Sequence, residues 1–146
     1  MDIIARFFTI FWGNMHPVSG LLRTQSLRKW KLREIVGEDL VLLTFLALRG
    51  DFIHVPSAHW HRREFRFEKS YHERLNRYKK GPQKITRTLL DRKLPFARLV
   101  FYLIIEVLNA KTSVLNKILI LVLLLPSFVA RFYSGKNQYK NYFPSA

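Results

Sequence analysis

Cysteine is absent from all 146 residues of the chain. This absence excludes disulfide bonds, thiolate metal sites and cysteine nucleophiles, although it fits any cellular compartment. The sequence also lacks a glycine-rich phosphate loop, a Gly-x-Ser-x-Gly motif and a pair of catalytic carboxylates. His54, His59 and His61 lie close together but lack the ligand spacing of zinc or di-iron sites. We therefore expect no enzyme activity, no metal and no cofactor.

Acidic residues are scarce, since 10 Asp and Glu stand against 25 Lys and Arg and leave a net charge of +15. At the same time, 49% of the residues are hydrophobic. Basic soluble domains are usually poorer in apolar residues, and apolar globular domains are usually closer to neutral. The combination indicates a chain with one part facing a polyanion or solvent and another part buried in lipid or in a partner protein.

The chain does have a long uncharged apolar run, residues 118–130, between Lys117 and Arg131. As a helix, residues 113–133 would extend about 32 Å at 1.5 Å per residue, close to the roughly 30 Å of a bilayer's hydrocarbon core. Lys117 and Arg131 would then extend toward the lipid headgroups. We predict a transmembrane helix over 113–133, with a kink at Pro126 because proline cannot donate the backbone hydrogen bond.

A second apolar segment, residues 96–109, precedes this helix. Its polar residues are spaced so that they share one helix face, which we call the polar stripe. The polar stripe consists of Arg98, Tyr102, Glu106 and Asn109. With Asn109 ending one helix and Ser113 capping the next, residues 95–133 are predicted to form a hydrophobic αα-hairpin. Because an unpaired carboxylate in lipid is costly, we expect the stripe to face a partner subunit, with Glu106 paired to a base there.

The N-terminal half is expected to form short helices. Residues 1–13 are amphipathic, which suits either a helix in the membrane interface or one packed on a partner. Within residues 26–50, Ser26 is placed to cap a helix that ends at Gly37. Asp39 is placed to cap a second helix, which is too short to cross a bilayer.

Residues 51–94 form a basic arm in which Arg and Lys alternate with aromatic residues. Three interpretations are open: an RNA-binding strip, a segment that binds anionic lipid headgroups, or an arm packed on partner subunits. No RNP, KH or double-stranded-RNA-binding signature is present. The candidate contacts to headgroups or phosphates are Arg62, Arg63, Arg66, Lys69, Arg74, Arg77, Lys79 and Lys80. A polar tail, residues 134–146, follows the predicted hairpin.

The predicted fold is mainly α, with short helices, a C-terminal hydrophobic αα-hairpin that has one or two membrane-embedded helices, an extended basic arm and no independent globular core. These features are typical of a non-catalytic accessory subunit that supports assembly and stability. We expect a large complex of the mitochondrial inner membrane, either of the respiratory chain or an ATP synthase. The basic arm would lie on the matrix side, next to anionic lipid such as cardiolipin. The alternative is an organellar ribosomal protein that binds rRNA through the arm.

Overall fold

A computed structural model of the chain describes residues 2–13, 16–55, 57 and 96–132 (the described residues). They form helices and connecting segments without a strand, which confirms the prediction of a mainly helical chain for this part of it. Most of the basic arm, the tail 134–146 and all of the candidate contacts from Arg62 to Lys80 lie outside the described residues.

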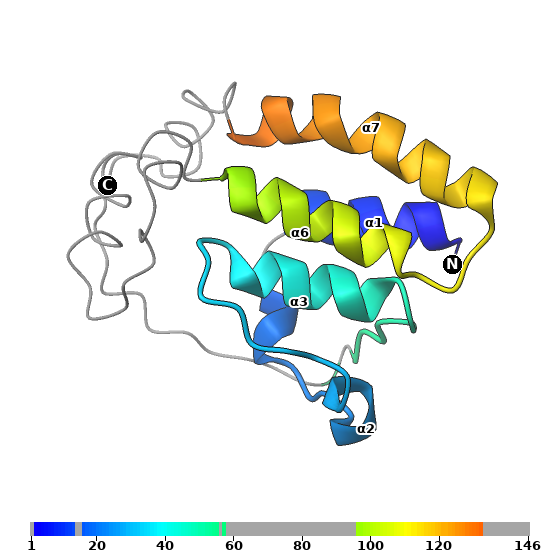
Figure 1. The fold of residues 1–146 in the computed structure, drawn as a ribbon. Helices are drawn as coiled ribbons and strands as arrows, with labels where there is room; N and C mark the ends of the chain where they lie inside the picture. Colours follow the sequence, from blue (N-terminus) through cyan, green and yellow to red (C-terminus); the bar gives the residue numbers. More distant parts are fainter. Residues whose placement is uncertain (1, 14–15, 56, 58–95, 133–146) are drawn as a thin grey trace, which may run out of the picture.

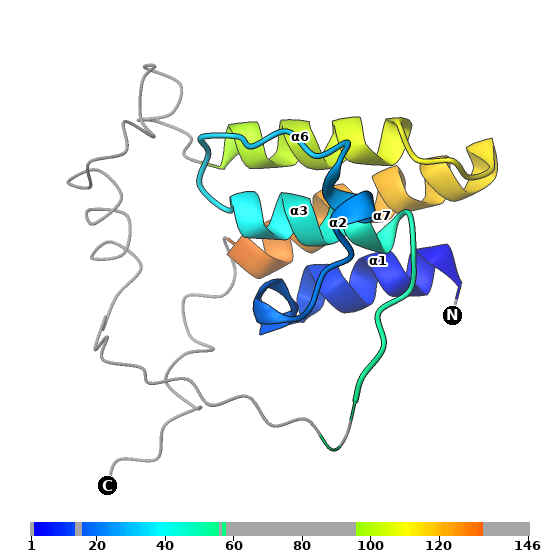
Figure 2. The same cartoon turned by 90° about the horizontal axis from the view of Figure 1, so that it is seen from below.

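Four helices run side by side in Figure 1: α1 (Ile3–Trp12), α3 (Glu38–Ala47), α6 (Ala97–Leu108) and α7 (Val114–Phe132). α3 packs on α1 and α6, and α7 packs on the same two helices, so the four helices surround a common interior. Figure 2 shows α3 between α1 and α6. A shorter 3₁₀ helix, η1 (His16–Ser19), contacts α3.

One buried apolar cluster joins all four helices. Its large, fully buried members include Phe7, Phe11, Leu40, Leu43, Leu99, Leu103, Ile120 and Leu124. The expectation that the chain has no globular core of its own is therefore wrong for the described residues. No single helix can bury its own apolar stripe, but four stripes that face one another can bury each other.

α1 packs within this cluster. Asp2 Oδ2 accepts a hydrogen bond from the Ile4 N–H at 3.1 Å, which satisfies one of the unpaired donors at the start of the helix. Phe7, Ile10 and Phe11 are buried on its inner face, where α1 meets α3 and α7. This contact within the chain differs from both sequence interpretations, a helix in the membrane interface and a helix packed on a partner, and it tests neither of them.

The segment before α3 differs from the prediction. The longer helix expected there is reduced to α2 (Thr24–Leu27), and residues 28–36 are not helical. A continued helix would place like charges one turn apart, as with Lys29 and Arg33, which is destabilising. In the observed conformation, the Arg33 backbone N–H instead donates to Glu38 Oε1 at 2.8 Å.

Gly37 precedes α3 instead of ending a helix. Its φ of 83° lies in the left-handed region that favours glycine, and its carbonyl accepts from the Leu40 N–H at 3.0 Å. A Cβ at this position would lie 2.9 Å from Leu99 Cδ2, so α3 and α6 meet closely here. Asp39, predicted as the cap, lies in the first turn of α3, where its charge is favourable to the helix dipole.

The connection between α6 and α7 contains both predicted capping residues. Asn109 is the C-cap of α6 and donates its N–H to Ile105 O at 3.0 Å. Ser113 Oγ accepts from the Asn116 N–H at 3.2 Å, and α6 packs against α7. α7 continues through Pro126, where the bend stays a prediction.

Candidate functional site

Glu106 is a buried carboxylate at the centre of the polar stripe, with 3% of its surface exposed. Its Oε1 lies 2.5 Å from Arg33 Nη2, and its Oε2 lies 3.3 Å from Arg49 Nη1. Burying a carboxylate without a counter-charge costs several kcal/mol, about 3–5 when one partner of a buried pair is removed. The three residues form a cluster, called here the Glu106 cluster, that joins α6 to residues on either side of α3.

Both arginines of the Glu106 cluster are held by aromatic rings. The Arg33 guanidinium carbon lies 4.7 Å from the centre of the Trp30 ring and 4.6 Å from that of Tyr102. Arg49 lies 3.8 Å from the Phe45 ring centre and donates to the Phe45 carbonyl at 3.0 Å. Such cation–π contacts orient the guanidinium groups and replace part of their lost hydration.

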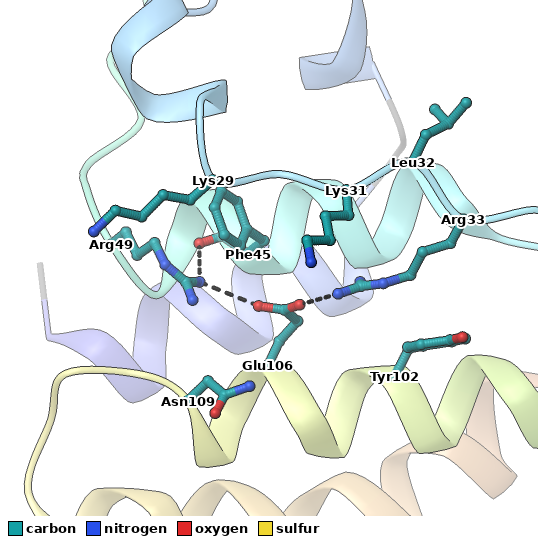
Figure 3. Close-up of a pocket in the computed structure, with 9 residues that line it drawn as sticks. All are labelled: Lys29, Lys31, Leu32, Arg33, Phe45, Arg49, Tyr102, Glu106 and Asn109. Carbon is teal, nitrogen blue, oxygen red and sulfur yellow. Dashed lines mark hydrogen bonds and ion pairs between the residues drawn. The ribbon is translucent and has the colours of Figure 1, made fainter.

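A cavity of about 460 Å³ lies over this cluster, between α3, α6 and the segment before α3 (Figure 3). We call it the basic cavity, because four of its lining side chains are cationic and one is acidic. Its lining residues are Lys29, Lys31, Leu32, Arg33, Phe45, Arg49, Tyr102, Glu106 and Asn109. Figure 3 shows Glu106 pointing from α6 toward α3, on the side of α6 away from α7.

The structure brings three of the four polar-stripe residues to one place. Tyr102, Glu106 and Asn109 line the basic cavity, whereas Arg98 is half-buried on α6 and does not line it. The bases expected on a partner subunit belong to this chain. Arg33 and Arg49 could not be predicted as partners of Glu106, because they lie 73 and 57 positions from it, beyond the reach of any helical periodicity.

α7 presents a continuous apolar face that nothing in the described part of the chain covers. Only Ile120, Leu124 and Phe128, spaced by four, are buried in this helix of 19 residues. The exposed apolar residues on α7 are Val114, Leu115, Ile118, Leu119, Val122, Leu123, Leu125 and Val129, each at least 40% exposed. Within the described residues, α7 is the one helix long and apolar enough to cross a membrane, with a mean hydropathy of 1.9.

The two cations flanking the apolar run do not extend freely from α7. Lys117 Nζ donates to the Leu108 carbonyl at 2.6 Å, at the C-terminus of α6. Arg131 Nη2 donates to the Gly13 carbonyl at 3.3 Å, just after α1. Each cation therefore binds the negative end of a neighbouring helix, where carbonyls lack intrahelical partners. The residues of α7 between Lys117 and Arg131 carry no charge, so the outer face of this helix is uncharged.

A second ion pair contrasts with the Glu106 cluster. Arg6 Nη1 on α1 lies 2.6 Å from Oδ1 of Asp51, just after α3, and the Asp51 side chain is largely exposed. The hydrogen bond and charge of Arg6 hold the pKa of Asp51 below its usual value. Exposed pairs of this kind contribute little to stability.

The described residues hold no group of three or more His, Asp or Glu side chains that could bind a metal ion. The geometry of the Glu106 cluster is suited to fixing three segments relative to one another.

A comparison with protein-family models, curated proteins and solved structures gives no significant match for this chain.

Proposed function

We propose that this chain is a non-catalytic accessory subunit of a large membrane complex and that α7 anchors it in the lipid. The observation that carries the proposal is the exposed apolar face of α7. The core helix of a soluble protein is mostly buried, whereas α7 buries 17% of its most apolar 18-residue window. Removing the eight half-exposed aliphatic side chains of α7 from water would contribute a favourable free energy on the order of 10 kcal/mol.

The dimensions of α7 favour lipid as the cover. Its 19 residues extend about 28 Å at 1.5 Å per residue, close to the roughly 30 Å hydrocarbon core. The exposed apolar face runs the length of the helix, from Val114 to Val129. A soluble partner would need a matching apolar groove of the same length, while a bilayer meets this requirement directly.

The arrangement of the other helices favours a complex over a lone anchored chain. α1, α3 and α6 run alongside α7, so they reach membrane depth when α7 crosses the bilayer. The segment before α3 carries several exposed cations, including Arg28, Lys29 and Lys31. Charges at that depth need protein or water around them, which neighbouring subunits supply. In this proposal α6 and α7 form an αα-hairpin that packs in the membrane part of the complex.

The proposed location is the mitochondrial inner membrane, in a respiratory-chain or ATP-synthase complex, with the basic arm on the matrix side. The support is the density of Lys and Arg in the basic arm. Such residues near a membrane span are retained on the side without translocation and are attracted to anionic lipid such as cardiolipin. The same charge is the one observation that favours an organellar ribosomal protein instead.

Fractionation of native membranes carrying a tagged chain separates these two functions. We expect the chain to remain in the membrane pellet through high salt and alkaline carbonate, because apolar contacts hold it there. Mild detergent is expected to release it in a particle much larger than its own 17.4 kDa. Release by high salt or nuclease, together with rRNA, would contradict the proposal, since phosphate contacts weaken steeply with salt.

A further inference from the structure

We propose that the basic cavity binds a phosphate monoester, through Lys29, Lys31 and the Glu106 cluster. The inference goes beyond the membrane-anchor function, because it concerns the face of α6 opposite α7. It does not depend on whether α7 contacts lipid or another protein. It assigns a ligand class to the cavity in Figure 3.

The cavity has an excess of positive charge. Glu106 pairs with Arg33 and Arg49, so its single negative charge is already shared between two guanidinium groups. Lys29 and Lys31 are exposed, and no carboxylate among the described residues pairs with either of them. Four cations against one carboxylate leave a formal charge of +3 in the lining.

One hydrogen-bond donor at the cavity is buried and lacks an acceptor. Arg33 Nη1 has no partner among the described residues, although Nη2 of the same group binds Glu106. The Trp30 and Tyr102 rings fix this guanidinium in place next to Lys29 and Lys31 in the cavity lining. A buried donor without an acceptor costs about 1–3 kcal/mol, so this guanidinium keeps unsatisfied positive charge beside the cavity.

A phosphate monoester fits these donors better than other ligand classes. It carries about two negative charges near pH 7, with three acceptor oxygens, and so matches an excess of several cations. A metal cation would be repelled by the same lysines and arginines. The volume of about 460 Å³ is large beside the roughly 10–15 Å³ of cavity that one water molecule needs. Leu32 is 82% exposed at the rim, where it offers an apolar contact to whatever the phosphate is attached to.

Calorimetric titration of the full-length chain in a non-ionic detergent tests the proposal. The probes are inorganic phosphate and dihexanoyl phosphatidic acid, with dihexanoyl phosphatidylcholine as the lipid without a monoester, all at constant ionic strength. We expect saturable binding of inorganic phosphate, of phosphatidic acid or of both. The double variant Lys29→Ala/Lys31→Ala should weaken it at least tenfold, and its melting temperature should stay unchanged because both side chains are exposed.

The matched control is Arg23→Ala/Arg28→Ala, which removes the same charge from the same segment outside the cavity lining. It should change the affinity less than twofold. Equal losses in both double variants, or no saturable binding by the unaltered chain, would overturn the proposal. Binding of phosphatidic acid without inorganic phosphate supports the site with a lipid headgroup as its source, and binding of both supports it with a soluble ester. The titration uses neither a membrane nor a complex. A negative titration would therefore not bear on the proposed membrane-subunit function, which the fractionation tests.

Discussion

Replacing Val122 and Leu125 together by lysine is expected to release the chain from membranes without unfolding it. Both side chains lie near the middle of α7 and are 63% and 57% exposed, so lysine at these positions disturbs no packing in the core. In lipid, each lysine at the centre of a spanning helix costs about 2.5–3.5 kcal/mol, and together they shift the membrane–water partition more than a thousandfold. Carbonate-resistant pelleting measures retention, and circular dichroism in detergent measures helix content.

The control for this variant is Leu21→Lys/Ile53→Lys, which makes the same chemical change at two apolar residues that are 106% and 82% exposed elsewhere. It should leave retention unchanged. If the Val122/Leu125 variant stays in the membrane as firmly as this control does, the exposed face of α7 does not contact lipid.

Glu106→Leu is expected to lower the free energy of unfolding by about 3–5 kcal/mol, because it leaves the mostly buried Arg33 without its counter-charge. The side chain of Arg33 is 16% exposed, so it cannot regain its hydration by a small movement. Chemical denaturation of the chain in detergent, followed by circular dichroism, measures the change.

A second variant separates loss of the ion pair from loss of packing. Arg33→Met/Glu106→Leu replaces both partners by apolar side chains of similar length, and it should recover most of the stability, since apolar replacements of whole buried pairs are often neutral or better. Asp51→Asn, at the exposed pair with Arg6, should have a much smaller effect. Unaltered stability in Glu106→Leu would show that the Glu106 cluster does not hold α6 in place.

The helix positions in the C-terminal part could be predicted because they depend on local sequence. The polar stripe, Asn109 and Ser113 all follow from helical spacing and capping preferences, which act within one or two turns. The faces of α7 could not be distinguished in this way. Val122 and Leu124 are both aliphatic residues in the same uncharged run, yet one is 63% exposed and the other fully buried.

The partners of Glu106 depend on tertiary packing and therefore could not be predicted from the sequence. Arg33 reaches Glu106 because residues 28–36 leave the helical conformation and run alongside α3. One feature of the sequence does indicate this conformation: the density of like charges in residues 28–36 disfavours a helix. The core was missed for a related reason: the apolar stripes of four separate helices complete one another only when they are brought together.

The depth of α7 in a bilayer is the most direct test of the proposed function. Since the chain has no cysteine, a spin label attached at Val122→Cys is the sole label, and Leu21→Cys provides the reference. The purified chain is labelled first and then incorporated into membrane vesicles. Electron paramagnetic resonance then measures how often each label meets oxygen, which concentrates in lipid, or a water-soluble nickel chelate. We predict that the label at position 122 meets oxygen and is protected from the chelate, with the opposite result at position 21. Protection of the label at 122 from both relaxants, or its exposure to the chelate, would contradict the assignment of α7 to the lipid.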